Sequence, residues 1–486
     1  MNNKTILELR KDLDNKTTTS EELFSSSVSL AHKYSKEFNP FVTIMDKLEE
    51  KLSSSLISGI PYTLKDNFST KGILTTSSSN ILKDYIPCYD STVYKKLHDS
   101  GAVLVGKTVL DELAMGGNGL SGHTGIVHNA YDSSRISGGS SSGSVVSVAL
   151  GIVPFSIGSD TGDSVRKPAS LNGVVGFKPT YGRISRYGLF PFASSLDHVG
   201  VITSCVEDAA IVTDILKGRD EKDMTSLEDD NIIYSQNLHK NIKDKKLFYI
   251  KEIVSRDKYK NDTSEVNEIL DNFFSLVDTL RKDGIEVEEV SVDPLLLDAL
   301  YPVYYSISCA EATSNNANLT GYIYGNTKQG NTSEEIMINT RTSGFSEMIK
   351  RRFIMGSYIL QRENQEKLFK NAGRIRRLIV DKMNELFLTY DALILPSSGS
   401  IAPLINEETK EDKLSDKYLM LENHLVIANF GGYPSISIPL CFVNNMPVGL
   451  SITSAAKEDL KLLNIASIIE EKTSLKGIIS KGEKHV

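Results

Sequence analysis

The sequence predicts an α/β fold in which helices cover a central sheet. Short apolar segments of strand length alternate with amphipathic segments of helical spacing, and this alternation is typical of layered α/β domains. Hydrophobic residues make up 40% and charged residues 24% of the chain, as in an ordinary globular protein. The 486 residues are enough for one large α/β unit or for two or three domains.

The elements of the first part follow one another closely. Thr19 to Glu22 form a capping box, which predicts the start of a helix whose apolar side includes Leu23, Val28, Ala31 and Tyr34. Apolar runs and helical spacing then predict a strand at 60–64, a helix at 93–98, a strand at 102–105, a helix at 145–150 and a strand at 153–157.

A polar and charged stretch at 217–246 predicts an exposed connection. Beyond it, a strand at 247–250, a helix from about Ser264 that stops at Gly284, and a strand at 285–290 predict an inserted βαβ subregion. A basic helical stretch at 350–382 and strands at 392–395 and 435–440 return to the main sheet. We therefore divide the chain into a first core part (1–216), the connection with the inserted subregion (217–300), and a core return (301–486).

Composition excludes several functional classes. The net charge of −8 is unlike that of a stand-alone nucleic-acid binder. The N-terminus lacks an apolar signal region, and no segment approaches the roughly 18 apolar residues of a membrane span, so we expect a cytoplasmic protein without membrane contact. The cysteines are too widely spaced for a metal site, and we expect buried thiols at Cys88, Cys205, Cys309 and Cys441.

Two motifs match well-known patterns without their context. Residues 101–108 satisfy the phosphate-loop pattern, but 102–105 reads as a strand where that motif needs a loop. Residues 139–143 match the nucleophile elbow of α/β-hydrolases around Ser141, with Asp391 and His424 available downstream. The elbow needs a buried strand just before it, and the preceding residues are polar. We therefore disfavour both interpretations.

Two glycine-rich turns carry the strongest chemical signal. Ser140 lies in the turn 137–144 and Ser164 in the turn 158–166, 24 positions apart, with no histidine between them. Backbone N–H groups of such turns can converge on a carbonyl oxygen, which acyl transfer to a serine requires. Lys65, after the apolar run 60–64, is a candidate base if burial lowers its pKa. In the alternative interpretations, Lys65 is a surface lysine and Ser140 to Ser142 cap a helix.

Residues 138–144 and 158–166 resemble two motifs of the amidase signature family, Gly-Gly-Ser-Ser-Gly-Gly-Ser and Gly-Ser-Asp-Thr-Gly-Gly-Ser-Ile-Arg. The resemblance implies a mixed, twisted central sheet with helices on both faces. It also implies a Ser-Ser-Lys triad in which Lys65 is the base, Ser140 the bridging serine after a cis peptide bond, and Ser164 the nucleophile. The oxyanion hole would be formed by the backbone N–H groups of Thr161, Gly162, Asp163 and Ser164.

Within the family, runs 65–72, 178–188 and 192–197 are similar to those of the A subunits of glutamyl-tRNA(Gln)/aspartyl-tRNA(Asn) amidotransferases. This implies a glutaminase that passes ammonia to a B subunit, which uses ATP and Mg²⁺ to activate misacylated tRNA, with a small C subunit bracing the pair. The glutaminase chain itself would need neither metal nor nucleotide. The resemblance places the glutamine-binding residues at Arg352, Glu422, and Tyr304 or Tyr305. For Arg352 the alternative is a solvated basic helix face, and for either tyrosine it is core packing.

Three departures from the family pattern stand out. Asp163 and Ser142 replace glycines of the two turns, and residues 118–121 lack the usual polar run. A Cβ at position 163 is expected to be disfavoured, and a carboxylate there would repel a developing oxyanion. A stand-alone amidase and a catalytically weakened assembly subunit therefore remain as alternatives to an active glutaminase subunit.

Overall fold

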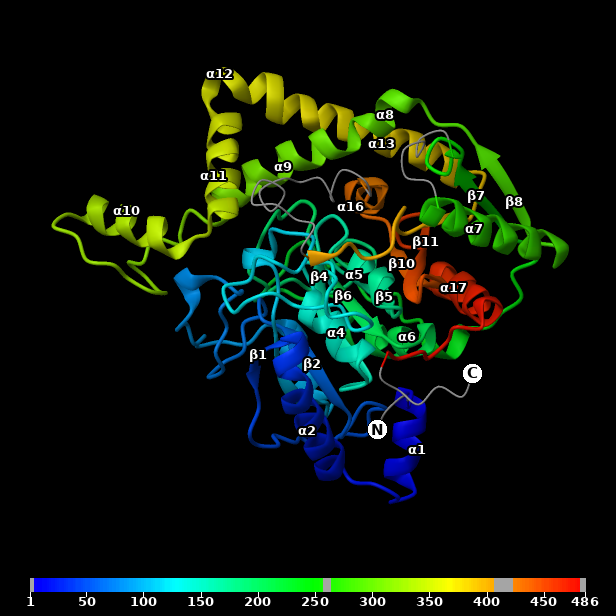
Figure 1. The fold of residues 1–486 in the computed structure, drawn as a ribbon, viewed down its shortest axis with the longest axis horizontal. Coiled ribbons are helices and arrows are strands. Elements are labelled where there is room, and N and C mark those ends of the chain that lie inside the picture. Colours follow the sequence, from blue (N-terminus) through cyan, green and yellow to red (C-terminus); the bar gives the residue numbers. More distant parts are fainter. Residues whose placement is uncertain (1–3, 257–263, 406–422, 481–486) are drawn as a thin grey trace.

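The computed structural model describes residues 4–256, 264–405 and 423–480. Its strands are β1 (Phe41–Ile44), β2 (Pro61–Lys65), β3 (Val103–Thr108), β4 (Phe155–Asp160), β5 (Val175–Lys178), β6 (His198–Thr203), β7 (Lys246–Ile250), β8 (Glu286–Val290), β9 (Ala392–Pro396), β10 (Ser435–Val443) and β11 (Met446–Ser454). They form one 11-stranded sheet in the order β1-β3-β2-β4-β6-β5-β10-β11-β9-β7-β8 (Figure 1). Parallel and antiparallel neighbours both occur, so the predicted mixed α/β fold is confirmed.

Helices cover both faces of this sheet. They are α1 (Ile6–Asp14), α2 (Ser20–Phe38), α3 (Thr92–Asp99), α4 (Ser142–Ala149), α5 (Arg166–Leu171), α6 (Val206–Leu216), α7 (Ser264–Lys282), α8 (Pro294–Asp298), α9 (Leu300–Asn315), α10 (Ser333–Gly344), α11 (Glu347–Leu360), α12 (Arg362–Gln365), α13 (Asn371–Phe387), α16 (Ile427–Phe430) and α17 (Asp459–Thr473). Side chains along β3 show the two faces: Val103 and Val105 pack with α2 and α4, whereas Leu104 belongs to the larger cluster that includes α3, α6 and α17.

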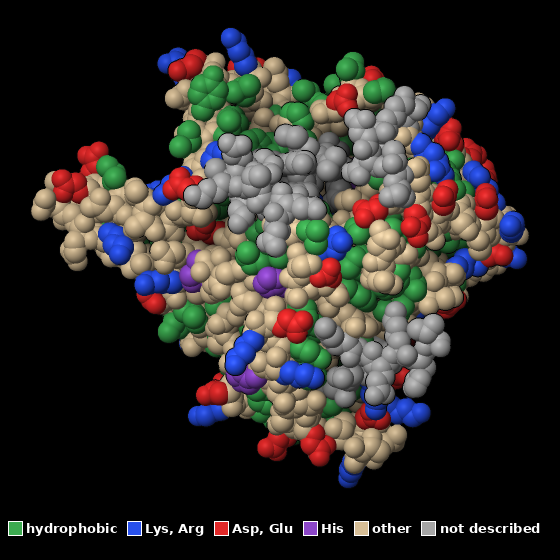
Figure 2. All heavy atoms as spheres, viewed as in Figure 1, with side chains coloured by type: hydrophobic (Ala, Val, Ile, Leu, Met, Phe, Trp, Pro, Cys, Tyr) green, Lys and Arg blue, Asp and Glu red, His purple; other side chains and the backbone are tan. Residues whose placement is uncertain are grey.

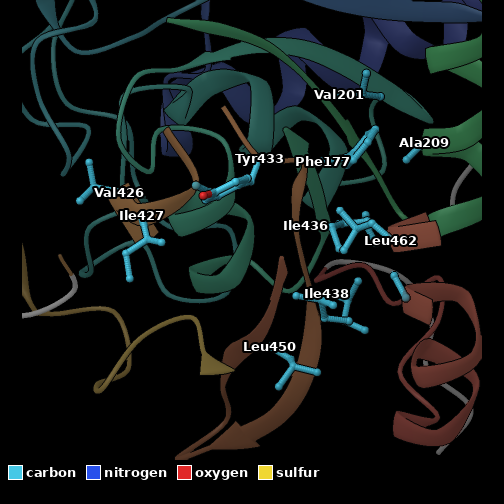
Figure 3. Close-up of a cluster of buried hydrophobic side chains, with 14 of the residues drawn as sticks. Phe177, Val201, Ala209, Val426, Ile427, Tyr433, Ile436, Ile438, Leu450 and Leu462 are labelled. Atoms are coloured by element: carbon cyan, nitrogen blue, oxygen red, sulfur yellow. The ribbon is translucent and has the colours of Figure 1, made fainter. Parts of the chain in front are cut away.

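The larger cluster joins segments that are far apart in the sequence. Phe177 and Val201 from the first part of the chain lie with Ile436, Ile438 and Leu450 from the last part (Figure 3). All are fully buried, and each such side chain contributes roughly 1.5–3 kcal/mol relative to exposure. The strands β10 and β11 therefore complete the sheet begun by the first 200 residues.

The parallel strands β2 and β4 are neighbours in the sheet, and this arrangement positions the functional residues. Leu64 pairs with Ile157, so the last residues of both strands reach the same edge. Lys65 lies at that edge beside Ser159 and Asp160. Polar residues follow both strands, Asp66 and Asn67 after β2 and Thr161 to Ser164 after β4, so polar groups from separate segments meet where the buried strands end.

Most predicted elements are present. Thr19 and Glu22 form the predicted capping box at the start of α2. The predicted strands and helices at 60–64, 93–98, 102–105, 145–150 and 153–157 correspond to β2, α3, β3, α4 and β4. The β7-α7-β8 unit is parallel as expected, and Gly284 follows α7 with φ +85°. Its strands extend the main sheet, because β7 pairs in parallel with β9.

Two expectations differ from the structure. The basic stretch 350–382 is not one helix: Gln361, with ψ 142°, separates α11 from α12, and a π-helical segment, Glu366–Lys370, precedes α13. Cys205, Cys309 and Cys441 are buried, but Cys88 is exposed, since it follows Pro87 in an irregular surface segment.

On the face shown in Figure 2, acidic and basic side chains are intermixed. The helices α9, α11 and α13 pack together, and α10 projects from the body of the molecule (Figure 1). Among the helices in the described ranges, none combines the length and the apolar character needed to cross a bilayer.

Candidate active site

Lys65 is fully buried at the end of β2, so the interpretation as a surface lysine is wrong. Its Nζ lies 2.8 Å from Ser140 Oγ, 2.9 Å from Ser141 Oγ and 2.9 Å from Ser159 Oγ. A fourth contact, 3.2 Å long, joins Nζ to the Ser159 carbonyl oxygen. The amine therefore lies among hydroxyl groups, and no carboxylate of the described residues bonds to it directly.

Burial lowers the pKa of Lys65 from its ordinary value of 10.5 to about 7. Carboxylates at Asp111, Asp160, Asp197 and Asp163 oppose this shift and raise the pKa. An exposed lysine is almost wholly protonated at neutral pH, whereas this amine is a base there for a substantial fraction of the time. The structure thus meets the condition for Lys65 to act as a base, namely that burial lowers its pKa.

The first serine turn presents Ser140 to Lys65. Gly138 has φ +71°, and the peptide bond between Gly139 and Ser140 is cis. The Ser141 N–H donates to the Ser164 carbonyl oxygen at 3.0 Å and so joins the two serine turns. Ser141 is the N-cap of α4 but makes no side-chain cap bond, so the interpretation of this hydroxyl as a helix cap is wrong.

The second turn follows β4 and leads into α5. Ser164 is 4% exposed and lies two residues before α5. Burial raises the pKa of Asp160, but the Arg166 guanidinium, together with Lys178 and Asn429, outweighs it and holds that pKa well below the usual range. Asp160 accepts from Arg166 at 3.0 and 3.1 Å and from the Val165 N–H at 3.0 Å. This ion pair stiffens the backbone on both sides of Ser164.

Thr161 ties the same turn to residues 192–197. Its hydroxyl donates to Asp197 Oδ1 at 2.7 Å, and the N–H groups of Phe192 and Ala193 also donate to Asp197. Burial raises the pKa of Asp197 to about 6 despite these donors. The run that carried part of the family resemblance therefore contacts the predicted oxyanion turn.

Asp163 is accommodated without backbone strain. It is not among the residues with positive φ, so its Cβ meets no conformational penalty and the expectation of a disfavoured Cβ is wrong. Its side chain is 8% exposed, and its charge raises the pKa of Lys65. The carboxylate therefore lies close enough to act on the triad, and its repulsion of a developing oxyanion stays a prediction.

Arg352 is 1% exposed, so the interpretation as a solvated helix face is wrong. Its guanidinium carbon lies 5.2 Å from the centre of the Tyr305 ring and 5.9 Å from that of Phe192. Tyr304 packs on the oxyanion turn, since a Cβ added to Gly162 would be 3.0 Å from its ring. Burial raises the pKa of Tyr304, with Arg352 and Asp163 acting on it in opposite directions. Glu422 lies outside the described residues.

The two disfavoured motifs have other roles. Residues 103–108 form β3, and Lys107 is buried with Asp66, 3.3 Å away. Ser141 contacts Lys65, whereas Asp391 pairs with Lys461 and His424 lies 3.0 Å from the Pro396 carbonyl oxygen. The triad that an elbow would require is therefore not assembled.

Within the described ranges, no group of three His, Cys, Asp or Glu residues is placed to hold a metal ion.

Sequence reasoning missed several contributors to this site. Ser159 contacts Lys65 and accepts from Asn67 Nδ2 at 3.0 Å, and Asp111 accepts the N–H groups of Gly119 and Ser121. Ser159 lies in the glycine-rich run 158–166, which was a usable signal. Asp111 gave none, because its contacts depend on how the loop that follows it, with Gly119 and Ser121, folds back.

Comparisons with known proteins show which proteins this chain is similar to. The Amidase family model matches residues 42–463. The A subunit of the glutamyl-tRNA(Gln) amidotransferase of Mycoplasma pneumoniae is 39% identical over 86% of this chain and 87% of its own length. Its counterpart in Sulfurisphaera tokodaii is 37% identical, covering 97% and 98%. The crystal structure of the counterpart from Thermotoga maritima superposes with a TM-score of 0.79 at 35% identity, covering 96% of this chain and 94% of the other.

Proposed function

The chain belongs to the amidase family, and from this we propose that it is the glutaminase subunit of a tRNA-dependent amidotransferase. The observation that carries the proposal is the buried Lys65 amine, with a pKa of about 7, in hydrogen-bond contact with Ser140. The names of the relatives, which are A subunits of glutamyl-tRNA(Gln) amidotransferases, support the choice of glutamine among possible amides.

The reaction would begin with proton transfer. Neutral Lys65 accepts the proton of Ser140 Oγ, and Ser140 takes the proton of Ser164 Oγ as this oxygen attacks the side-chain amide carbon of glutamine. The proton returns through Ser140 to the amide nitrogen, the C–N bond breaks, and ammonia leaves. A γ-glutamyl ester on Ser164 remains, and water hydrolyses it by the same proton route.

The oxyanion would be stabilised by the N–H groups of residues 161–164, on the turn that Asp160 and Asp197 hold in place. Arg352 would bind the α-carboxylate of glutamine, which suits a guanidinium with its paired donors. Tyr304 would line the pocket, consistent with its packing on Gly162. Glu422 would meet the α-amino group.

Ammonia would pass to a B subunit that uses ATP and Mg²⁺ to amidate Glu-tRNA(Gln), Asp-tRNA(Asn) or both. A small C subunit would complete a heterotrimer in the cytoplasm, with tRNA bound through the B subunit. No metal or nucleotide takes part in the chemistry assigned to this chain. This assembly rests on the names of the relatives and on the family resemblance.

The test is glutamine hydrolysis by the chain co-expressed with the B and C subunits of its own organism. We expect glutamate and ammonia to form, and Ser164→Ala to abolish the reaction. Ser142→Ala is the matched control: Ser142 is also buried in the first turn, but its hydroxyl contacts the Val109 carbonyl oxygen, 3.3 Å away. Turnover that is unaffected by Ser164→Ala would refute the nucleophile assignment.

Asp163 favours a second candidate, an assembly subunit with weakened glutaminase activity. Its carboxylate opposes both the developing oxyanion and the neutral form of Lys65. If the activity is weakened in this way, Asp163→Gly raises kcat at least about tenfold. If the subunit is a fully active glutaminase, the same substitution changes kcat little. A chain that purifies alone and hydrolyses simple amides but not glutamine would instead be a stand-alone amidase.

A further inference from the structure

We propose that Asn429 is a positioning residue for the oxyanion turn, residues 161–164. The inference rests on the proposed acyl-transfer chemistry, but it does not require that the substrate be glutamine. Asn429 lies in the short helix α16, far from the turn in the sequence, and is fully buried. It would act through the residues that hold the turn.

One amide group contacts three residues from two segments, 158–166 and 192–197. Asn429 Nδ2 donates to Asp160 Oδ1 at 2.9 Å and to the Asp160 and Leu196 carbonyl oxygens at 3.3 Å each. Asn429 Oδ1 accepts from Arg166 Nη2 at 2.7 Å. The donors of the amide thus face a carboxylate and two carbonyl groups, and its acceptor faces a guanidinium.

The ion pair that Asn429 completes determines how the turn presents its N–H groups. The same Arg166 Nη2 donates to the Gly162 carbonyl oxygen at 2.7 Å. Because the peptide unit is planar and trans here, the Asp163 N–H points opposite to the Gly162 C=O, away from Arg166. Fixing the guanidinium therefore fixes the direction of an N–H group in the predicted oxyanion hole.

The contact with Leu196 secures the other side of the turn. Leu196 immediately precedes Asp197, which accepts the Thr161 hydroxyl. The Leu196 carbonyl oxygen also lies 2.6 Å from His198 Nδ1. The segment just before β6 is therefore held both by Asn429 and by His198. Asn429 thereby joins the two supports of the turn, the Asp160–Arg166 pair and the Asp197 segment.

An amide is required because the position needs a neutral group that both donates and accepts. A carboxylate at 429 could still accept from Arg166, but it would lack the donors and would repel Asp160. An alanine would leave buried polar groups without these partners. The two substitutions therefore separate loss of contact from introduced charge.

The first experiment measures steady-state amide hydrolysis by the chain in its complex. We expect Asn429→Ala to lower kcat by roughly 10- to 100-fold, somewhat less than removal of an oxyanion donor itself, with KM changed by less than about threefold. The matched control is Asn129→Ala. Asn129 is equally buried, and its side chain makes three hydrogen bonds, to Tyr131, Ile136 and Leu171, none within residues 160–166.

The second experiment uses pH. We expect the kcat of Asn429→Asp, divided by that of the wild type, to rise as the pH falls from about 8 to about 5.5, because protonation of the introduced carboxyl restores a donor and removes the repulsion. The same ratio for Asn429→Ala stays flat. A merely structural role predicts no such dependence in either variant.

A third measurement is the affinity for an aldehyde analogue of the substrate, which forms a tetrahedral adduct with Ser164. Asn429→Ala should weaken this inhibitor by about the factor lost in kcat, while the affinity for the reaction product, glutamate, is retained. Equal losses in Asn429→Ala and Asn129→Ala, or a rise in KM without a fall in kcat, would overturn the proposal. If glutamine is not hydrolysed but another amide is, in a Ser164-dependent manner, the proposed function fails and the same three measurements still test Asn429.

Discussion

The charge state of Lys65 leads to a prediction about how the reaction depends on pH. Lowering its pKa from 10.5 to about 7 means that the folded protein disfavours the charged amine by roughly 5 kcal/mol. About half of the molecules then carry a neutral amine at pH 7, against about three in ten thousand for an unperturbed lysine. Because only the neutral amine is a base, activity is lost as the pH falls through 7.

The assay is kcat/KM for glutamine hydrolysis between about pH 5.5 and 9. We expect a rise to a plateau with an apparent pKa of about 7, and a roughly fivefold fall from pH 7 to pH 6. Asp111→Asn removes the largest charge that raises the pKa of Lys65, so the rising limb moves to lower pH. Lys65→Arg replaces the amine with a group that stays charged, and kcat falls by about 10²–10⁴-fold. A flat profile in the wild type, or an active Lys65→Arg variant, would refute this reasoning.

Three further predictions concern other parts of the site and the fold. Arg352→Gln should raise KM for glutamine by about 10- to 100-fold, with a smaller change in kcat, because a charge-assisted contact to the α-carboxylate is lost. KM for simple amides, which have no α-carboxylate, should change less, and steady-state kinetics with both substrates make the comparison. Gly162→Ala places a Cβ 3.0 Å from the Tyr304 ring, so we expect kcat to fall by about tenfold or more while the melting temperature changes little. Burial raises the pKa of Asp208 to about 7 and that of Glu470 to about 8, so the folded state keeps protons that the unfolded state releases near pH 4, and these groups reduce stability as the pH rises toward 8. Urea unfolding of the Asp208→Asn, Glu470→Gln variant should therefore show a stability gain over the wild type at about pH 8 that disappears at about pH 5.

The elements that were predictable from the sequence have strong local signals. The capping box of α2, the apolar run of β2 and the helical spacing of α7 depend on neighbouring residues, and each element lies within a few positions of its prediction. The strands β5 and β6 were missed, because glycine interrupts both and the apolar run of each is short. Strand order likewise depends on contacts between the ends of the chain, such as that of β5 with β10.

The candidate site divides in the same way. Lys65, Ser140 and Ser164 were found because two of them lie in glycine-rich runs and the third follows an apolar strand. The burial of Arg352 was not predictable, since three consecutive basic residues suggest a solvated face and only the folded chain brings Phe192 to this side chain. Asn429 gave no signal at all, because an isolated asparagine acquires its role only from the segments that meet around it.

The last strand of the sheet, β8, bears on how the protein behaves at high concentration. An outermost strand offers backbone groups to which another chain could add a strand, and such edges promote aggregation. Glu286, Glu288 and Glu289 are exposed along this strand, and at neutral pH two copies brought edge to edge would place like charges against each other. Replacing them with valine or threonine, residues that favour strands, should leave the triad intact and yet cause the purified protein to self-associate, as light scattering would detect.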